Sequence, residues 1–187
     1  MRFFTVVVAV SGIICTLALA KLRMNGSESM PIGIYAVGPA VTINRGDIVS
    51  ACPSAQAQAL GLVRGYLVRA SNYAFGRYCK SGAQPLLKYV AALGGDEIEI
   101  TADSFSVNRK LLDRRRLDRY DRHHRRLAAF QPGRYRLKPD DVWLYSPAAY
   151  GWDSRYFGPA KLRDIMGTAK PLLTFGSLEH ERRRDRN

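Results

Sequence analysis

Short stretches that mix apolar and polar residues dominate the chain beyond residue 21. In Glu97-Ile98-Glu99-Ile100 every second residue is apolar, as expected for a strand with one buried face. A strand-like pattern recurs at residues 32–37, 47–51, 86–93, 97–101, 105–112 and 142–145. Residues 54–63 instead favour a short helix, with Ser54 as the N-cap of a run of Ala, Gln and Leu. The pattern predicts a mainly β domain.

Glycine and aspartate mark the connections between these strands. Arg45-Gly46-Asp47, Gly94-Gly95-Asp96 and Pro139-Asp140-Asp141 each combine residue types that are typical of tight turns. Each of the three triplets leads into a predicted strand. We therefore expect short turns rather than long crossover connections at these points.

The N-terminal stretch has a different character. Residues 3–20 carry no charge and are mostly Val, Ala, Ile, Leu and Phe, which is just long enough to cross a hydrocarbon core of about 30 Å as a helix. The stretch ends in Ala18-Leu19-Ala20, a small-x-small pattern like that of a secretory cleavage site. An uncleaved anchor is the favoured interpretation, a removed signal peptide is the second, and a buried core helix is the third. The first two place the remaining chain outside the cytoplasm.

This division predicts three parts: a membrane anchor or signal segment at 1–24, a periplasmic domain at 25–178, and a charged tail at 179–187. If the N-terminal segment is cleaved, the domain is secreted to the periplasm. Cys52 and Cys79 fall in the exported part, where an oxidising compartment permits a disulfide, although two free thiols are the alternative. The third cysteine, Cys15, lies inside the apolar segment.

The formal net charge is +13, which suits either nucleic acid or an anionic lipid surface. Much of it comes from residues 109–126 and 181–187, and we expect the first of these to be a solvated loop with some helical turns. Tyr120 is the one aromatic residue in that run, which argues against stacking on nucleic acid. His123 and His124 lie among arginines that would repel a metal ion, so we expect neither a metal nor a cofactor.

Two polar residues carry the candidate chemistry. Ser29 follows the apolar segment closely, but a serine is a weak nucleophile unless a nearby base takes its proton. None of the three histidines precedes His123, so a Ser-His-Asp triad fits poorly. Lys88 lies inside the apolar stretch 85–93, and burial would lower its pKa and favour the neutral form that a base requires. The simpler alternatives are an ordinary loop serine and a strand lysine that faces solvent.

Four sequence boxes occur in a fixed order: residues 27–31, 45–49, 88–98 and 153–158. These ordered boxes follow an N-terminal apolar segment, and together they resemble the sequence boxes of the signal peptidase I family. The short chain and the Leu-Leu-Lys-Tyr-Val stretch that contains Lys88 are most similar to TraF-type peptidases of conjugal transfer systems. The resemblance covers roughly residues 25–175.

The resemblance implies a signal-peptidase-like β-domain of antiparallel strands and a Ser/Lys dyad. Ser29 would be the nucleophile and Lys88 its base, while Ser27 would add a hydroxyl to the oxyanion hole. Asp153 and Arg155 match a box in which family members hold a supporting ion pair. The implied activity is removal of a leader or terminal peptide from an exported substrate, a conjugative pilin precursor, at the outer face of the cytoplasmic membrane. Hydrolysis and cyclisation of the product both stay open.

The sequence also departs from the family pattern at three points. Tyr89 replaces an arginine after the lysine, the turn at 92–96 lacks its proline, and Gly151 stands where a serine often orients the lysine. The rival functions are a non-catalytic tethered component of a conjugation apparatus and an exported nucleic-acid-binding protein. Only the peptidase requires Ser29 and Lys88 to lie close together.

Overall fold

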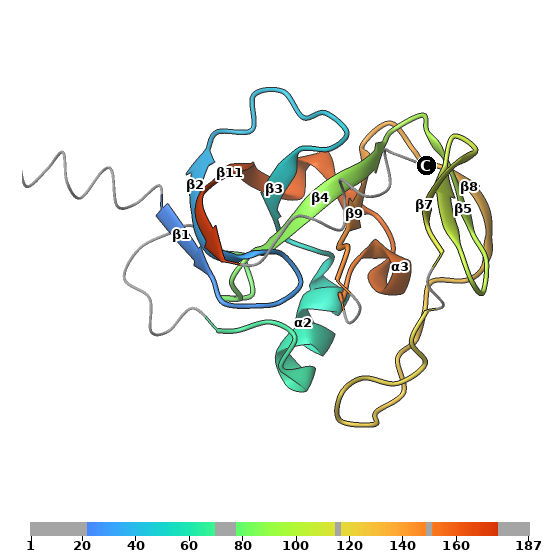
Figure 1. The fold of residues 1–187 in the computed structure, drawn as a ribbon, viewed down its shortest axis with the longest axis horizontal. Helices are drawn as coiled ribbons and strands as arrows, with labels where there is room; N and C mark the ends of the chain where they lie inside the picture. Colours follow the sequence, from blue (N-terminus) through green and yellow to red (C-terminus); the bar gives the residue numbers. More distant parts are fainter. Residues whose placement is uncertain (1–21, 70–77, 115–116, 149–150, 176–187) are drawn as a thin grey trace, which may run out of the picture.

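The computed structural model describes residues 22–69, 78–114, 117–148 and 151–175 (Figure 1). The apolar stretch 3–20 and the charged tail expected at 179–187 lie outside the described residues, whereas residues 22–24, the end of the anchor or signal segment expected at 1–24, belong to the first strand. Among the residues that are described, no helix is long and apolar enough to span a membrane.

A curled antiparallel sheet of seven strands forms the body of the domain (Figure 1). Every neighbouring pair in it is antiparallel. The mainly β, antiparallel prediction is therefore confirmed. In spatial order the strands are β1 (Leu22–Asn25), β2 (Ile32–Gly38), β11 (Ile165–Phe175), β3 (Ile48–Ala51), β4 (Leu86–Leu93), β9 (Asp141–Tyr145) and β10 (Ala160–Lys161).

A second, smaller sheet lies at the opposite end of the molecule from β1 (Figure 1). Its order is β7 (Lys110–Asp113), β6 (Phe105–Val107), β5 (Glu97–Ile100) and β8 (Gly133–Arg136). The alternation in β5 buries Ile98 and Ile100, which join a core cluster with Phe105 and Trp143. This shared cluster packs the small sheet against β4 and β9.

The predicted helix is present as α2 (Ala55–Arg64), and its N-cap Ser54 accepts a hydrogen bond from the backbone N–H of Ala57. It ends at Gly65, whose φ of 74° is the left-handed conformation that glycine adopts at helix ends. Two short elements follow β9 and β10: α3 (Ser154–Phe157) and the 3₁₀ turn η2 (Leu162–Asp164). The N-cap of α3 is Asp153, one of the candidate site residues.

Two expectations for the region 105–126 were wrong. The single strand expected at 105–112 is a hairpin, because Asn108 and Arg109 adopt φ values of 50° and 66° and turn the chain between β6 and β7. The arginine-rich run was expected to be a solvated loop with some helical turns. It begins instead in that turn and in β7. Its residues from 117 to 126 form a loop that is mostly exposed, as expected, but this loop contains no helical turn, and it contacts the domain through Arg125 and Asp121.

Cys52 and Cys79 are joined by a disulfide, with their Cα atoms 5.7 Å apart. Both residues are buried in a cluster with Ala57, Ala83 and Trp152. The bond therefore ties the end of β3 to the segment that leads into β4, the strand that carries Lys88.

We expect opening this disulfide to lower the free energy of unfolding by about 3 kcal/mol, since it closes a loop of 27 residues. Quantitative thiol labelling of the non-reduced, denatured full chain should modify Cys15 and spare Cys52 and Cys79. Chemical denaturation of the Cys52→Ala/Cys79→Ala variant measures the stability change. Labelling of both Cys52 and Cys79 without reductant would contradict the bond.

Candidate active site

The loop between β1 and β2 presents Ser29 and is fixed by hydrogen bonds from its own flanks. Asn25 Nδ2 donates to the carbonyl oxygens of Ser27, Met30 and Pro31 at 2.9, 3.0 and 3.0 Å. The Tyr35 hydroxyl donates to the Pro31 carbonyl at 2.7 Å. Met30, the residue after Ser29, is 2% exposed and packs in a core cluster with Tyr35. Ser29 therefore lies on a loop that is held by hydrogen bonds and by the burial of the neighbouring Met30 side chain.

The two hydroxyls of this loop form a short chain. Ser27 Oγ lies 3.0 Å from Ser29 Oγ and 3.0 Å from Asn25 Oδ1. If the Ser27 hydroxyl donates to Asn25, the Ser29 hydroxyl can donate to Ser27. Both serines line one groove.

Lys88 lies near the middle of β4, opposite Val49 of β3. Its side chain is 1% exposed, and no carboxylate among the described residues lies within 4.0 Å of Nζ. Burial lowers the pKa of Lys88 to about 8, with Asp153 acting in the opposite direction and Arg155 and Arg23 adding to the decrease. About a tenth of the amine is therefore neutral at pH 7, and the neutral form is the one that a general base requires.

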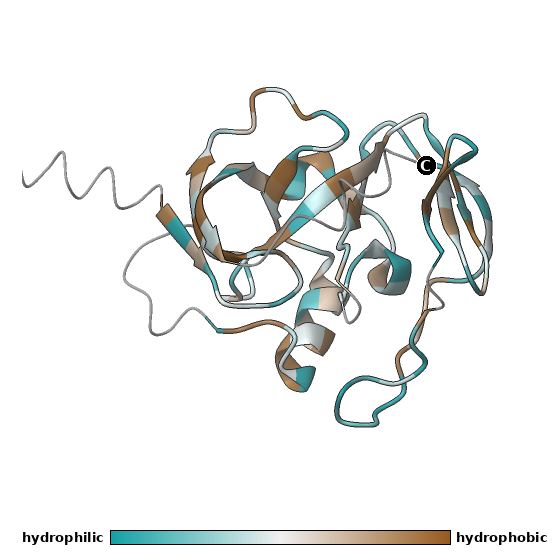
Figure 2. Cartoon of the chain, in the orientation of Figure 1, coloured by the Kyte–Doolittle hydropathy of each residue, from teal (hydrophilic) through white to brown (hydrophobic). Residues whose placement is uncertain are grey.

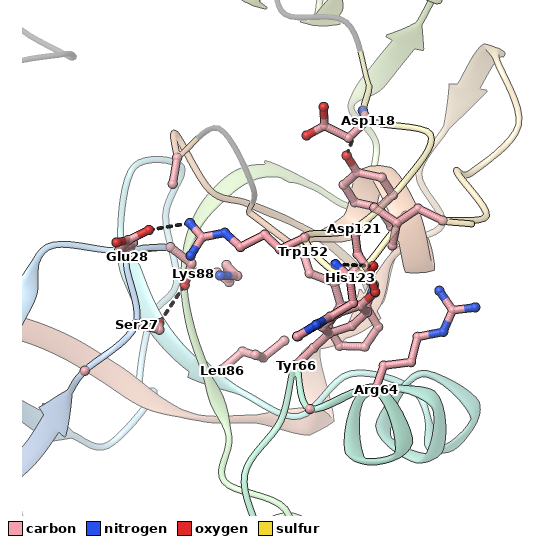
Figure 3. Close-up of a pocket in the computed structure, with 17 residues that line it drawn as sticks. Ser27, Glu28, Arg64, Tyr66, Leu86, Lys88, Asp118, Asp121, His123 and Trp152 are labelled. Carbon is pink, nitrogen blue, oxygen red and sulfur yellow. Dashed lines mark hydrogen bonds and ion pairs between the residues drawn. The ribbon is translucent and has the colours of Figure 1, made fainter. Parts of the chain in front are cut away.

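One groove of about 610 Å³ brings these residues together. In Figure 3, Ser27, Glu28 and Lys88 lie at one end, while Arg64, Asp121 and His123 lie at the other. Tyr66, Trp152 and Tyr156 give the groove an aromatic wall. Ser29 and Lys88, far apart in sequence, both line it, and the burial of Lys88 excludes the alternative of a strand lysine that faces solvent.

Behind the groove lies a cluster of buried charges around Arg155. Asp153 accepts from Arg155 Nη2 at 2.8 Å and Nε at 2.9 Å, and Arg155 Nη1 donates to Asp113 at 2.9 Å. The guanidinium also lies 4.9 Å from the Tyr145 ring centre. Burial alone would lower the pKa of Arg155, but the two carboxylates raise it, so it stays charged. The sequence indicated Asp153 and Arg155, but it did not indicate Asp113.

Ser146 connects this cluster to the loop that carries Ser29. Its backbone N–H donates to Asp153 at 2.8 Å, and its hydroxyl donates to the Ser29 carbonyl at 2.5 Å. Gly151 leaves the room for this side chain, because a Cβ at position 151 would overlap Ser146 Oγ and Cβ. The space that a serine at 151 would need is thus filled by Ser146, which contacts Ser29 directly.

The basic loop, residues 117–126, lines the groove through Asp118, Asp121, Arg122 and His123. Arg122 makes an ion pair with Glu28, the neighbour of Ser29. Asp121 accepts from the Tyr66 hydroxyl at 2.5 Å and from Arg125 Nε at 2.7 Å, and Arg64 donates to the Arg126 carbonyl at 2.6 Å. This loop is therefore part of the site. Within the described ranges, no group of three or more His, Cys, Asp or Glu side chains could hold a metal ion.

The family follows from comparison with known proteins. Residues 1–173 match the family described as signal peptidase, peptidase S26. The chain belongs to this family, as its sequence boxes suggested, and the membership supports a serine peptidase.

Three relatives share about a third of its residues over most of both chains. A probable conjugal transfer protein TraF of Sinorhizobium fredii is 33% identical over 177 residues, covering 91% of this chain and 87% of its own. The conjugal transfer protein TraF of Agrobacterium tumefaciens is 31% identical, covering 90% and 91%. The plasmid transfer protein TraF of Escherichia coli is 31% identical, covering 84% and 85%. A signal peptidase I structure from Enterococcus faecalis aligns with 17% identity and a TM-score of 0.38, over 68% of this chain and 96% of its own.

Proposed function

We propose that the chain is a membrane-tethered serine endopeptidase in which Ser29 is the nucleophile and Lys88 the general base. Its substrate is an exported protein, the pilin precursor of a conjugation system, from which it removes a leader or terminal peptide. One observation carries the proposal: a serine on a rigid loop and a buried lysine with a lowered pKa line the same groove. A non-catalytic tethered component would need neither feature.

The proposed reaction begins with neutral Lys88. It takes the Ser29 proton as Oγ attacks the scissile carbonyl, and the backbone N–H of Ser29 and the Ser27 hydroxyl stabilise the oxyanion. Lys88 then gives its proton to the leaving amine as the peptide C–N bond breaks. Attack on the acyl-enzyme by water releases a linear product, whereas attack by the amino group of the substrate itself closes a ring. In both cases the proton returns through Lys88 to Ser29 Oγ.

An apolar surface supports the proposed position at the periplasmic face of the cytoplasmic membrane. β2 pairs with both β1 and β11, and the register places Phe175 beside Ile32 and Met24 beside Ile34. Figure 2 shows hydrophobic residues at this end of the sheet. Its exposed apolar residues are Leu22, Met24, Ile32, Leu172, Leu173 and Phe175. They begin at Leu22, close behind the apolar stretch 3–20 of the predicted anchor, so an anchored domain could rest this surface on lipid.

The charge pairing supports a protein substrate over nucleic acid. Arg122 and Arg125, in the most basic part of the sequence, are paired with Glu28 and Asp121. Phosphate binding on this loop would have to compete with these carboxylates.

Co-expression of the full chain with a candidate pilin precursor tests the function. Intact-mass spectrometry of the membrane fraction should show the pilin shortened by a terminal peptide, and a cyclised product should be lighter than the linear one by one water. The Ser29→Ala variant is the matched control and should leave the precursor intact. Equal processing with that variant would assign the cleavage to another enzyme and overturn the proposal.

A further inference from the structure

Ser146 is a buried serine that uses each of its polar groups. Its backbone N–H donates to Asp153 at 2.8 Å, and its carbonyl oxygen accepts from Arg155 Nη2 at 3.1 Å. Its hydroxyl donates to the Ser29 carbonyl at 2.5 Å and accepts from the Ala148 N–H at 3.4 Å. The residue is 0% exposed. The buried ion pair of Asp153 and Arg155 therefore holds the Ser146 backbone, while the hydroxyl points at the loop that carries Ser29.

The strand register brings Ser146 close to Lys88 as well. Ser146 is the first residue after β9, and Tyr145, the last residue of that strand, pairs with Tyr89 of β4. One step further along this antiparallel register, the position opposite Lys88 is Ser146. Residues opposite each other in an antiparallel pair have their Cβ atoms about 5 Å apart on the same face of the sheet. Ser146 thus lies between the strand of the buried lysine and the loop of the serine.

The hydrogen bond from Ser146 acts on the backbone of Ser29 itself. Asn25 and Tyr35 hold the carbonyls on either side of Ser29, and Ser146 supplies the donor for the Ser29 carbonyl. Because the peptide group is planar, holding this oxygen restrains the rotation of Ser29 about its Cα–C bond. It therefore restrains the direction in which the Ser29 side chain projects from the loop.

Displacing a reacting group by about 1 Å can slow a reaction about a hundredfold. We propose that Ser146 is a positioning residue of the reaction, whose hydroxyl holds the backbone of Ser29 so that Oγ meets the buried amine of Lys88. Gly151 leaves room for this arrangement, because a Cβ at position 151 would overlap Ser146 Oγ. The inference rests on the proposed function, since it gives Ser146 a role through Ser29.

The placement of residue 29 can be measured without any substrate. In a Ser29→Cys background, a lysine nearby favours the thiolate, which is the form that iodoacetamide alkylates. Mass spectrometry of the peptide that contains position 29 gives the alkylation rate of the full chain in detergent at pH 7. Adding Ser146→Ala should slow it about threefold to tenfold, the effect of raising the thiol pKa by half a unit to one unit, and adding Lys88→Ala should slow it likewise. Ser50→Ala is the matched control, since it removes a buried hydroxyl of β3 outside the groove, and it should leave the rate unchanged.

Processing of the pilin precursor gives a second reading. Ser146→Ala should lower kcat about tenfold to hundredfold and leave KM unchanged, because Ser146 does not line the groove that would bind the substrate. The backbone N–H of residue 146 still holds Asp153 in this variant, so the acid limb of the pH profile should stay in place. A merely structural role would lower the folded fraction in thermal unfolding and leave kcat per folded molecule at the parental value.

Gly151→Ala tests the same contact from the opposite side. Its Cβ would displace the Ser146 hydroxyl, so this variant should lose rate as Ser146→Ala does and should also lose stability. The double variant Ser146→Gly/Gly151→Ala removes the overlap and should regain the stability without regaining the rate. Recovery of both in the double variant would show that the hydroxyl of Ser146 is not needed.

The outcomes separate the two proposals. An unchanged alkylation rate in Ser146→Ala overturns the role of Ser146, whatever the parent does to the pilin precursor. Failure of Ser146→Ala to accumulate, with Ser50→Ala at the parental level, would assign Ser146 a structural role and would overturn it equally. Processing that survives in Ser29→Ala would instead overturn the proposed function, while the alkylation result on Ser146 would still stand.

Discussion

Replacing Lys88 by arginine should abolish processing as completely as removing the Ser29 hydroxyl does. Guanidinium stays protonated at every accessible pH and cannot accept the serine proton. Lys88→Arg, Lys88→Ala and Ser29→Ala should each lower the cleavage rate by a factor on the order of 10⁴ to 10⁶. Time courses of pilin precursor cleavage in membranes that contain each variant measure the loss.

The double variant Ser29→Ala/Lys88→Ala should be no slower than either single variant, because residues that act as one unit are not additive. Lys170→Arg is a matched control, since this lysine is exposed on β11 and does not line the groove, and it should process at the parental rate. Each protein must accumulate to the parental level for the comparison to hold. Substantial cleavage by Lys88→Arg would mean that another group is the base.

The sequence predicts elements well where local pattern and burial agree. β4 runs over Leu86–Leu93, as expected, because an apolar stretch bounded by turn residues has little alternative to a central strand. β11 was missed because Gly167, Lys170 and Pro171 interrupt it, and a register shift between Pro171 and Leu173 breaks its alternation. The hairpin at 105–113 was missed because its turn uses Asn108 and Arg109 rather than an Asn-Gly pair.

At the site, too, residues marked by a local sequence pattern could be predicted, and residues without such a pattern could not. Ser29 and Lys88 could be proposed because the ordered sequence boxes resemble the signal peptidase I family and because Lys88 lies inside an apolar stretch. Asp113 stands at the edge of an arginine-rich run, and nothing local distinguishes it from a solvated aspartate. Ser146 contacts Ser29 across 117 positions, and Arg23 reaches Pro85 across 62. Such contacts depend on the curl of the sheet, which no local pattern records.

Loss of the buried Asp113 carboxylate should destabilise the fold strongly. Asp113 is 1% exposed and accepts hydrogen bonds from Arg155 Nη1 and the Tyr145 hydroxyl, both at 2.9 Å. Asp113→Ala would leave one arm of a buried guanidinium without its carboxylate. Removing one partner of a buried ion pair typically costs about 3 to 5 kcal/mol, and we expect a loss of about 3 kcal/mol because Asp153 still holds the other arm.

Urea unfolding of the full chain in detergent, followed by circular dichroism, measures this loss. Asp103→Ala, which removes an exposed carboxylate between β5 and β6, is the matched control and should change stability by less than about 0.5 kcal/mol. Because Asp113 supports Arg155 rather than touching the nucleophile, the Asp113→Ala molecules that stay folded should retain cleavage far above the level of Ser29→Ala. A stability loss below about 1 kcal/mol would show that Asp153 alone satisfies Arg155. The cluster would then support the groove through Asp153 and Ser146, without a contribution from Asp113 of the small sheet.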